Sequence, residues 1–397
     1  MPRILLLALA CGVAVANIYF PQAISPLIAA DLHVNTDQAA LVATAAQLGY
    51  AGGVFLLVPL GDRLPNRPLI LVLLSLTGLG LLVAGTAQTL SVLVVASVAV
   101  GLTTVVPQII IPMTVGLVAP ERRGAVTGTL LGGLLGGILL ARTFGGTVGE
   151  WLGWRAPYLT AAGLALLLAV GLLFIVPSTT PSSKQSYPAL VGAAVRLFWT
   201  EPELRRSGLY QAMMFGAFSA AWTSLSLLVS GPVYNRSADT VGLLALVGAA
   251  SVLSTPITGR WIDRRGSDPV SLVCIVGGVI AAGVLAFGGI GGIGGLIVLG
   301  AGMLVLDTAV QSGQVANQSR IFALRPDARS RVNTAYMTCS FIGGTVGSWL
   351  GIQVYTAMGW LGVSGLVALA AAVALTRHLL RRSPAARQRP ALSETGG

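Results

Sequence analysis

One carboxylate lies deep inside an apolar stretch of the chain, where a carboxylate can do proton chemistry. Asp307 is the only acidic residue clearly inside an apolar segment of membrane-spanning length, and it lies 320 − 307 = 13 residues before Arg320. At a helical rise of 1.5 Å per residue this is about 20 Å from that charged end. An ionised carboxylate at such depth is costly unless it is paired, hydrated or protonated. The position predicts a proton-binding site; a permanently paired structural acid is the alternative.

A basic residue at a comparable depth is the natural partner of this acid. Arg142 lies 142 − 124 = 18 residues beyond Gly124 in another apolar segment, or roughly 27 Å along a helix. We expect Arg142 and Asp307 to form a proton-coupling pair that separates when Asp307 gains a proton. The alternative is an arginine whose long side chain reaches the nearer membrane surface.

Two acid–base pairs follow apolar segments about half a chain apart. Asp62-Arg63 ends one segment, and Asp263-Arg264 ends another, 263 − 62 = 201 positions later in the 397-residue chain. Further features recur in the same order in the two halves: Gln108 and Gln314, Arg122-Arg123 and Arg329-Ser-Arg331, Gly132-Gly133 with Gly136-Gly137, and Gly343-Gly344 with Gly347. Such a repeat is typical of membrane carriers built from two related halves.

The composition indicates that lipid is the solvent of most of the chain. Apolar residues make up 54% and charged residues 9%, whereas soluble domains are about a quarter charged. We therefore predict an all-α, polytopic membrane protein. The 51 glycines suit its helices, because small residues let membrane helices approach closely.

Apolar runs of about 20 residues predict twelve transmembrane helices, arranged as two pseudo-symmetric bundles of six. They lie near 4–28, 38–60, 68–88, 91–118, 125–147 and 156–176, and near 207–231, 240–259, 269–288, 292–317, 332–355 and 360–379. We divide the chain into an N-terminal bundle (1–176), a cytoplasmic linker (177–206), a C-terminal bundle (207–380) and a disordered cytoplasmic tail (381–397). The linker ends in a short amphipathic piece around 190–199.

The basic residues predict the orientation in the membrane. With the N-terminus in the cytoplasm, 21 of the 24 Lys and Arg residues fall on the cytoplasmic side. This skew places both termini there. The net charge of +11 therefore lies in short loops between helices, which argues against nucleic acid as a partner.

Enzyme chemistry finds no support in the chain. Cys11, Cys274 and Cys339 lie within apolar segments, and the two histidines lie at segment edges. We expect no metal site and no cofactor. The glycine-rich run at 288–294 lacks the lysine of a nucleotide-binding loop, so we expect an ion gradient or the substrate's own gradient to drive any transport.

The segments around the acid–base pairs resemble the signature G-x-x-x-D-R-x-G-R-R of the major facilitator superfamily. The second copy keeps Gly259, Asp263, Arg264 and Gly266; the first keeps Asp62, Arg63 and Arg67, but has Val58, Pro65 and Asn66 at other signature positions. The resemblance implies that these residues gate the inner side. Asp62 would face the N-terminus of the eleventh helix, and Asp263 that of the fifth. It also places the fifth helix near the eighth and tenth, so that Arg142 and Asp307 would join the halves.

Finer details resemble the bacterial drug/proton antiporter group, near the purine-nucleoside and sugar efflux pumps. Residues 16–22 and 137–142 carry this resemblance, but Ser97 and Gly137 replace an arginine and a proline of the group's motifs. It implies a monomeric carrier in the bacterial inner membrane that exports a small organic molecule in exchange for protons. The alternatives are proton-coupled uptake or facilitated transport of a small polar metabolite and, more remotely, a membrane sensor that no longer transports.

The family lines its substrate cavity with the first, fourth, seventh and tenth helices. Their polar and aromatic residues at mid-depth here are Asn17, Tyr19, Gln22, Gln108, Phe218, Trp222, Gln311 and Gln314. Amides and aromatic rings suit a neutral or weakly polar, ring-bearing substrate. Buried amides also join membrane helices to one another, so a purely structural role is the alternative.

Overall fold

The apolar segments fold as helices throughout the part of the chain that can be described. The computed structural model describes residues 2–119, 123–177, 185–324 and 329–380, and these contain helices and no strand. The expected tail lies outside the described residues, as does part of the expected linker.

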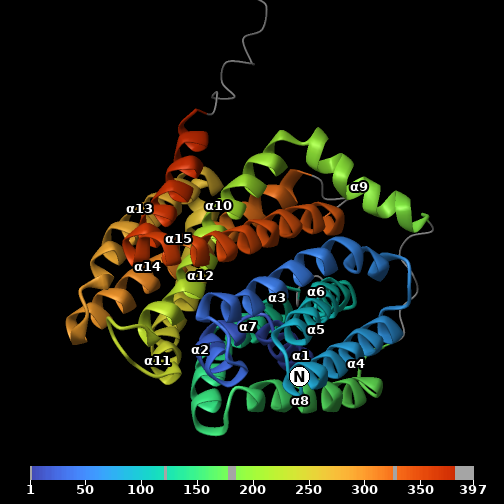
Figure 1. Cartoon of the computed structure of the whole chain (residues 1–397). Coiled ribbons are helices and arrows are strands. Elements are labelled where there is room, and N and C mark those ends of the chain that lie inside the picture. The colour runs from blue at the N-terminus through green and yellow to red at the C-terminus, as the bar shows by residue number, and fades with distance from the viewer. Residues whose placement is uncertain (1, 120–122, 178–184, 325–328, 381–397) are drawn as a thin grey trace, which may run out of the picture.

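Helices α1 to α8 and η1 form the first group, and α10 to α15 with η3 and η4 form the second; Figure 1 shows the first in blue to green and the second in yellow-green to red. The first group is α1 (Pro2–Ala16), α2 (Pro21–Leu32), α3 (Thr36–Leu56), η1 (Val58–Asp62), α4 (Asn66–Gly85), α5 (Leu90–Thr103), α6 (Pro107–Gly116), α7 (Arg123–Leu152) and α8 (Arg155–Leu173). The second is α10 (Pro202–Ser230), α11 (Ala238–Gly248), η3 (Ala249–Leu253), α12 (Ser254–Arg265), α13 (Ser267–Ala286), η4 (Phe287–Gly289), α14 (Gly292–Leu324) and α15 (Arg329–Leu379). Between them lies α9 (Tyr187–Thr200), the short helix expected near 190–199.

The number of membrane crossings agrees with the sequence once bent helices are counted. Within the described residues, ten helices are long and apolar enough to cross a membrane, and α1 with α2, bent by 43°, form an eleventh span. At 1.5 Å per residue the 51 residues of α15 would extend about 76 Å, far more than the roughly 30 Å of a bilayer core. Its backbone turns at Gly359 (φ 66°), between the two expected spans, so α15 makes two crossings and the total is 10 + 1 + 1 = 12.

Three spans that the sequence predicts as continuous are broken. The first breaks at residues 17–20 and the fourth at 104–106, and each resumes at a proline, Pro21 or Pro107. Proline suits the first turn of a helix because it lacks the N–H that would have no partner there. The eighth span passes through the 3₁₀ segment η3.

The paired glycines hold equivalent helices together in the two groups. A Cβ atom on Gly137 of α7 would lie 2.2 Å from the carbonyl oxygen of Gly12 in α1. In the second group, a Cβ on Gly347 of α15 would lie 2.1 Å from the carbonyl oxygen of Gly216 in α10. The repeated glycines thus allow the close helix approach expected from them.

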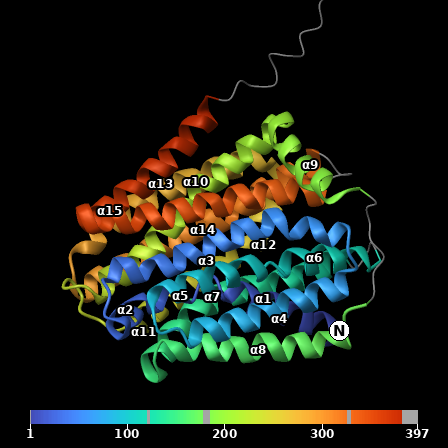
Figure 2. The same cartoon turned by 45° about the vertical axis from the view of Figure 1, so that its right-hand side comes forward.

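Side-chain hydrogen bonds join the two groups at one end of the molecule. Figure 2 shows α2 and α11 at this end, called here the α11 end, and α9 with the N-terminus at the other, the α9 end. Near the α11 end, hydroxyl pairs cross the interface: Ser25 to Ser226 at 3.0 Å and Thr44 to Ser348 at 2.7 Å. Thr143 of α7 also donates to the carbonyl of Gly242 in α11 at 2.8 Å. The α11 end is therefore closed.

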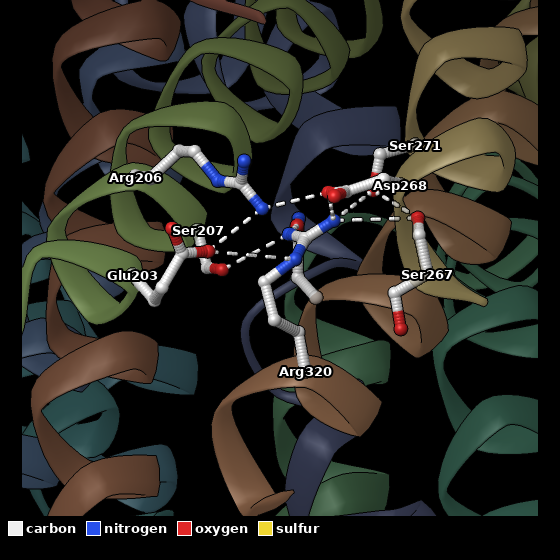
Figure 3. Close-up of polar contacts among 8 residues, drawn as sticks. Glu203, Arg206, Ser207, Ser267, Asp268, Ser271 and Arg320 are labelled. Atoms are coloured by element: carbon white, nitrogen blue, oxygen red, sulfur yellow. Dashed lines mark hydrogen bonds and ion pairs between the residues drawn. The ribbon is translucent and has the colours of Figure 1, made fainter. Parts of the chain in front are cut away.

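A charged cluster fixes three helices of the second group to one another at the α9 end (Figure 3). Arg206 of α10 and Arg320 of α14 lie 2.7 Å and 3.0 Å from the same oxygen of Asp268 in α13. Glu203 accepts from Arg206 at 2.7 Å, and Ser271 accepts from Arg320 at 2.8 Å. The side chains of Arg206 and Arg320 are 6% and 9% exposed and share one carboxylate, so the cluster links α10, α13 and α14.

Candidate functional site

Arg142 lies in an enclosure of aromatic rings near the middle of the protein. Its side chain is only 2% exposed, so it does not reach the membrane surface. The guanidinium carbon lies 4.2 Å from the ring centre of Trp222, 5.0 Å from Tyr19 and 5.1 Å from Phe218. Its Nε donates to Gln22 Oε1 at 2.8 Å, while Nη2 is buried without a hydrogen-bond partner. The ring faces stabilise a cation that is cut off from water.

Asp307 lies at the N–H edge of Trp222, whose ring face carries Arg142, and is 3% exposed. The indole Nε1 of Trp222 donates to Asp307 Oδ1 at 2.9 Å. The ion pairs among the described residues do not include Arg142 with Asp307, although the two charges attract each other. The structure thus brings the expected partners together, but it couples them through one indole instead of a direct contact.

A small cavity lies next to the enclosure, between the two groups of helices. Its volume is about 40 Å³, and it is lined by Val15, Tyr19, Tyr50, Gln108, Leu134, Leu135, Ile138, Phe215, Phe218, Val310, Gln311, Gln314, Met337, Ser340 and Phe341. Tyr19 and Phe218 belong both to the cavity lining and to the ring enclosure of Arg142. These two rings therefore separate the cavity from the buried charges.

Five of the eight residues expected to bind substrate line this cavity: Tyr19, Gln108, Phe218, Gln311 and Gln314. The other three, Asn17, Gln22 and Trp222, do not line it. Asn17 donates to Thr104 Oγ1 at 3.2 Å, because the broken first helix turns Asn17 toward the broken fourth. Gln22 binds Arg142, and Trp222 binds Asp307.

Residues outside the four expected helices also shape the cavity. Phe341 of α15 lies against Tyr50 of α3, with ring centres 4.3 Å apart, and Gln108 donates to the Tyr50 hydroxyl at 3.3 Å. Beside them Gln47 is fully buried, and neither atom of its amide has a hydrogen-bond partner. The family pattern of cavity-lining helices does not point to Phe341; its place two residues before Gly343-Gly344 is the one available signal.

The expected gate residues lie at the α9 end in unequal settings. Asp62 is half-buried in η1, which packs against α15, the helix that it was expected to face. Asp263 is exposed on α12 and makes no hydrogen bond or ion pair with the described part of the chain, so the expected contact with the fifth span is not formed in this conformation. The extensive contacts of α7 with the eighth span are instead with α11 and η3, toward the α11 end.

The remaining residues of the two signatures act within their own groups. Arg67 donates to the carbonyl oxygen of Leu173 at the end of α8. Arg63 and Arg264 are exposed. Gly266 has φ 78° in the turn between α12 and α13, a conformation that favours glycine, whereas a Cβ on Gly259 would meet nothing within 4 Å.

Comparisons with known proteins agree with this architecture. Residues 5–317 match the Major Facilitator Superfamily. The chain is 36% identical over 360 residues to the "Putative uncharacterized transporter YgaY" of Escherichia coli (strain K12), covering 91% of this chain and 90% of that protein. It is 27% identical over 295 residues to the "Chloramphenicol resistance protein" of Streptomyces lividans, with 71% of each covered.

Among solved structures, the nucleoside transporter NupG shares the fold. Its TM-score is 0.74 at 12% sequence identity, and the match covers 95% of this chain and 98% of that one. The family expected from the acid–base signatures is therefore confirmed, and the fold agrees with it. The chain is a multi-pass membrane protein that belongs to the major facilitator superfamily of transporters.

Proposed function

We propose that this transporter exports a small organic molecule in exchange for protons, by alternating access between its two groups of helices. One observation carries the proposal. Asp307 is buried beside the interface of the groups, bound to the N–H of Trp222 and held without a direct ion pair, and Arg142 of the other group lies over the face of the same indole. A carboxylate in such a position can change charge without breaking a salt bridge.

The charges of this site couple protonation to the interface. When Asp307 is ionised, it attracts Arg142 across Trp222 and so favours contact of α7 with α10 and α14. When Asp307 binds a proton, the attraction disappears and Arg142 keeps only the rings and Gln22. The α11 end then opens more easily. The moving bodies are the two six-helix bundles, 1–176 and 207–380, in a monomer with both termini in the cytoplasm.

The cavity lining suggests the class of substrate. Aromatic rings of Tyr50, Phe215, Phe218 and Phe341 surround the amides of Gln108, Gln311 and Gln314, which suits a ring-bearing molecule with few charges. A substrate in an expanded cavity would touch Tyr19 and Phe218, the rings that also hold Arg142. The name of the Streptomyces relative adds support for a drug-like molecule.

Transport by inverted vesicles tests the proposal. Vesicles loaded with a pH dye are energised, and dyes, nucleosides and sugars are then added one class at a time. We expect one class to release protons from the acidified lumen, and Asp307→Asn to abolish that release while substrate exchange persists. Asp37→Asn, which removes a carboxylate at the start of α3, is the control and should behave as the wild type. Proton movement that survives in Asp307→Asn, or transport that moves no protons in the wild type, would overturn proton-coupled export.

A further inference from the structure

The eighth span breaks beside the proton-binding candidate. Helix α11 ends at Gly248, and a Cβ atom there would lie 2.5 Å from Asp307 Oδ2. The carboxylate therefore lies directly against the end of α11, where the 3₁₀ segment η3 begins. A 3₁₀ stretch inside a longer helix often marks a functional site.

Hydroxyl groups continue from this break toward the α9 end. Ser251 lies in η3, one 3₁₀ turn after Gly248; it is 1% exposed, and its Oγ has no hydrogen-bond partner. Ser254 Oγ lies 2.6 Å from the Ser251 carbonyl oxygen and 3.1 Å from Ser312 Oγ of α14. Thr258 Oγ1 of α12 lies 2.9 Å from the same Ser312 Oγ.

Some buried hydroxyls of the protein are satisfied within their own helix. Ser97 and Thr114 each donate to the backbone carbonyl four residues earlier, the common way in which a membrane helix satisfies a hydroxyl. Ser312 and Thr258 instead bond to other hydroxyls, across the contact between α12 and α14. A hydroxyl that both accepts and donates can pass a proton along such a row.

We propose that the hydroxyls of Ser251, Ser254, Ser312 and Thr258 form the path by which Asp307 exchanges its proton with the α9 side. The inference rests on the proposed proton coupling and names the route that it uses. Asp307 gives its proton to a neighbouring oxygen, with water molecules joining Asp307 to the Ser251 hydroxyl and that hydroxyl to Ser254, because Ser254 Oγ contacts Ser251 only at its carbonyl. Each hydroxyl accepts one proton and passes on its own, so one proton moves, Asp307 becomes a carboxylate and nothing is oxidised.

The closed α11 end fits this direction of exchange. In this conformation the hydroxyl pairs of Ser25 with Ser226 and Thr44 with Ser348 join the groups at that end. The path runs the other way, and Thr258 lies 263 − 258 = 5 residues before the exposed Asp263 of α12. Asp263 lies about 7.5 Å farther along the helix than Thr258, toward the α9 end.

The test needs no substrate, because the proton is the probe. Full-length protein in detergent is mixed rapidly with acid, and tryptophan fluorescence is followed, since Trp222 binds Asp307 directly. The phase that Asp307→Asn removes reports protonation of Asp307. We expect Ser312→Ala and Thr258→Val each to slow this phase at least about tenfold, and Ser312→Thr, which keeps the hydroxyl, to restore it.

Thr77→Val is the matched control, because Thr77 also bonds a second hydroxyl, that of Thr103, at 2.9 Å but belongs to the first group. It should leave the phase unchanged. A phase of wild-type rate in the double variant Ser312→Ala with Thr258→Val would overturn the path while leaving proton coupling intact. Absence of any phase that depends on Asp307 in the wild type would overturn the proposed function, and the path with it. Thermal unfolding of each variant identifies any loss of fold, and a slow phase in Ser312→Thr would also contradict the path.

Discussion

Trp222 donates its indole N–H to Asp307 at 2.9 Å, and the same ring lies 4.2 Å from the guanidinium carbon of Arg142. One side chain of α10 therefore touches both buried charges, one on each group of helices. Rotation of this ring, or its displacement by a molecule in the cavity, changes both contacts together.

Replacing Trp222 by Phe separates the two contacts. Trp222→Phe keeps a ring beside Arg142 but removes the donor to Asp307, and a hydrogen bond to a charged group is worth about 1.5–3 kcal/mol. The carboxylate loses that stabilisation, so proton release should require a higher pH than in the wild type. The pH profile of substrate-driven proton movement in proteoliposomes measures the shift. An unchanged profile would show that the indole N–H has no part in coupling.

Gly248 should be sensitive even to one added methyl group. Its Cβ would lie 2.5 Å from Asp307 Oδ2 and 3.4 Å from Trp222, so Gly248→Ala must push the carboxylate away from the indole. We expect a loss of proton coupling close to that of Asp307→Asn, with substrate exchange retained. Gly283→Ala in α13, where nothing lies within 4 Å, is the control. Normal proton coupling in Gly248→Ala would show that the end of α11 can shift to make room for the added methyl group without disturbing Asp307.

Two adjacent glycines of α7 should differ sharply in their effect on stability. A Cβ on Gly133 would lie 2.3 Å from the carbonyl oxygen of Ala8 in α1, whereas a Cβ on Gly132 would meet nothing within 4 Å. Overpacking costs about 1–3 kcal/mol, so Gly133→Ala should lower the thermal unfolding temperature in detergent. Gly132→Ala should leave it unchanged or raise it slightly. Equal unfolding temperatures would show that α1 and α7 can separate freely.

The two gate acids should differ in the step that they affect. Asp263 has no hydrogen bond or ion pair with the described residues in this conformation, so Asp263→Asn should leave the stability of the protein unchanged and instead slow formation of the state closed at the α9 end. We expect Asp263→Asn to reduce turnover more than Asp62→Asn, because the signature around Asp263 is nearly complete. Turnover in proteoliposomes, with thermal unfolding measured in parallel, checks both. A larger loss of turnover in Asp62→Asn would reverse the assignment.

The spans and their repeat could be predicted because the bilayer sets both. Its thickness demands about 20 apolar residues per crossing, and the acid–base pairs and paired glycines recur at fixed places between the crossings. The breaks at 17–20, 104–106 and 249–253 could not be predicted in this way. Neighbouring helices satisfy the backbone there, so the apolar pattern continues across each break.

The charged site was predicted in part. Comparable depth in the membrane, together with the helix neighbours that the family resemblance implies, brought Arg142 and Asp307 together. The position of Trp222 between them depends on the relative rotation of α7, α10 and α14, which composition and spacing do not record. The break in the first helix likewise turned Asn17 away from the cavity and left Tyr19 facing it.

The cavity of about 40 Å³ holds a few water molecules at most, whereas sites for organic ligands measure about 300–1,000 Å³. In this conformation the cavity is therefore too small to hold an organic substrate. An exchanger must also change conformation without its substrate in each cycle, and it does so only with the counter-ion bound. For the proton exchange proposed above, a space this small would hold no organic substrate while hydroxyl pairs join the groups at the α11 end, so the carrier would change conformation with a proton bound and no substrate.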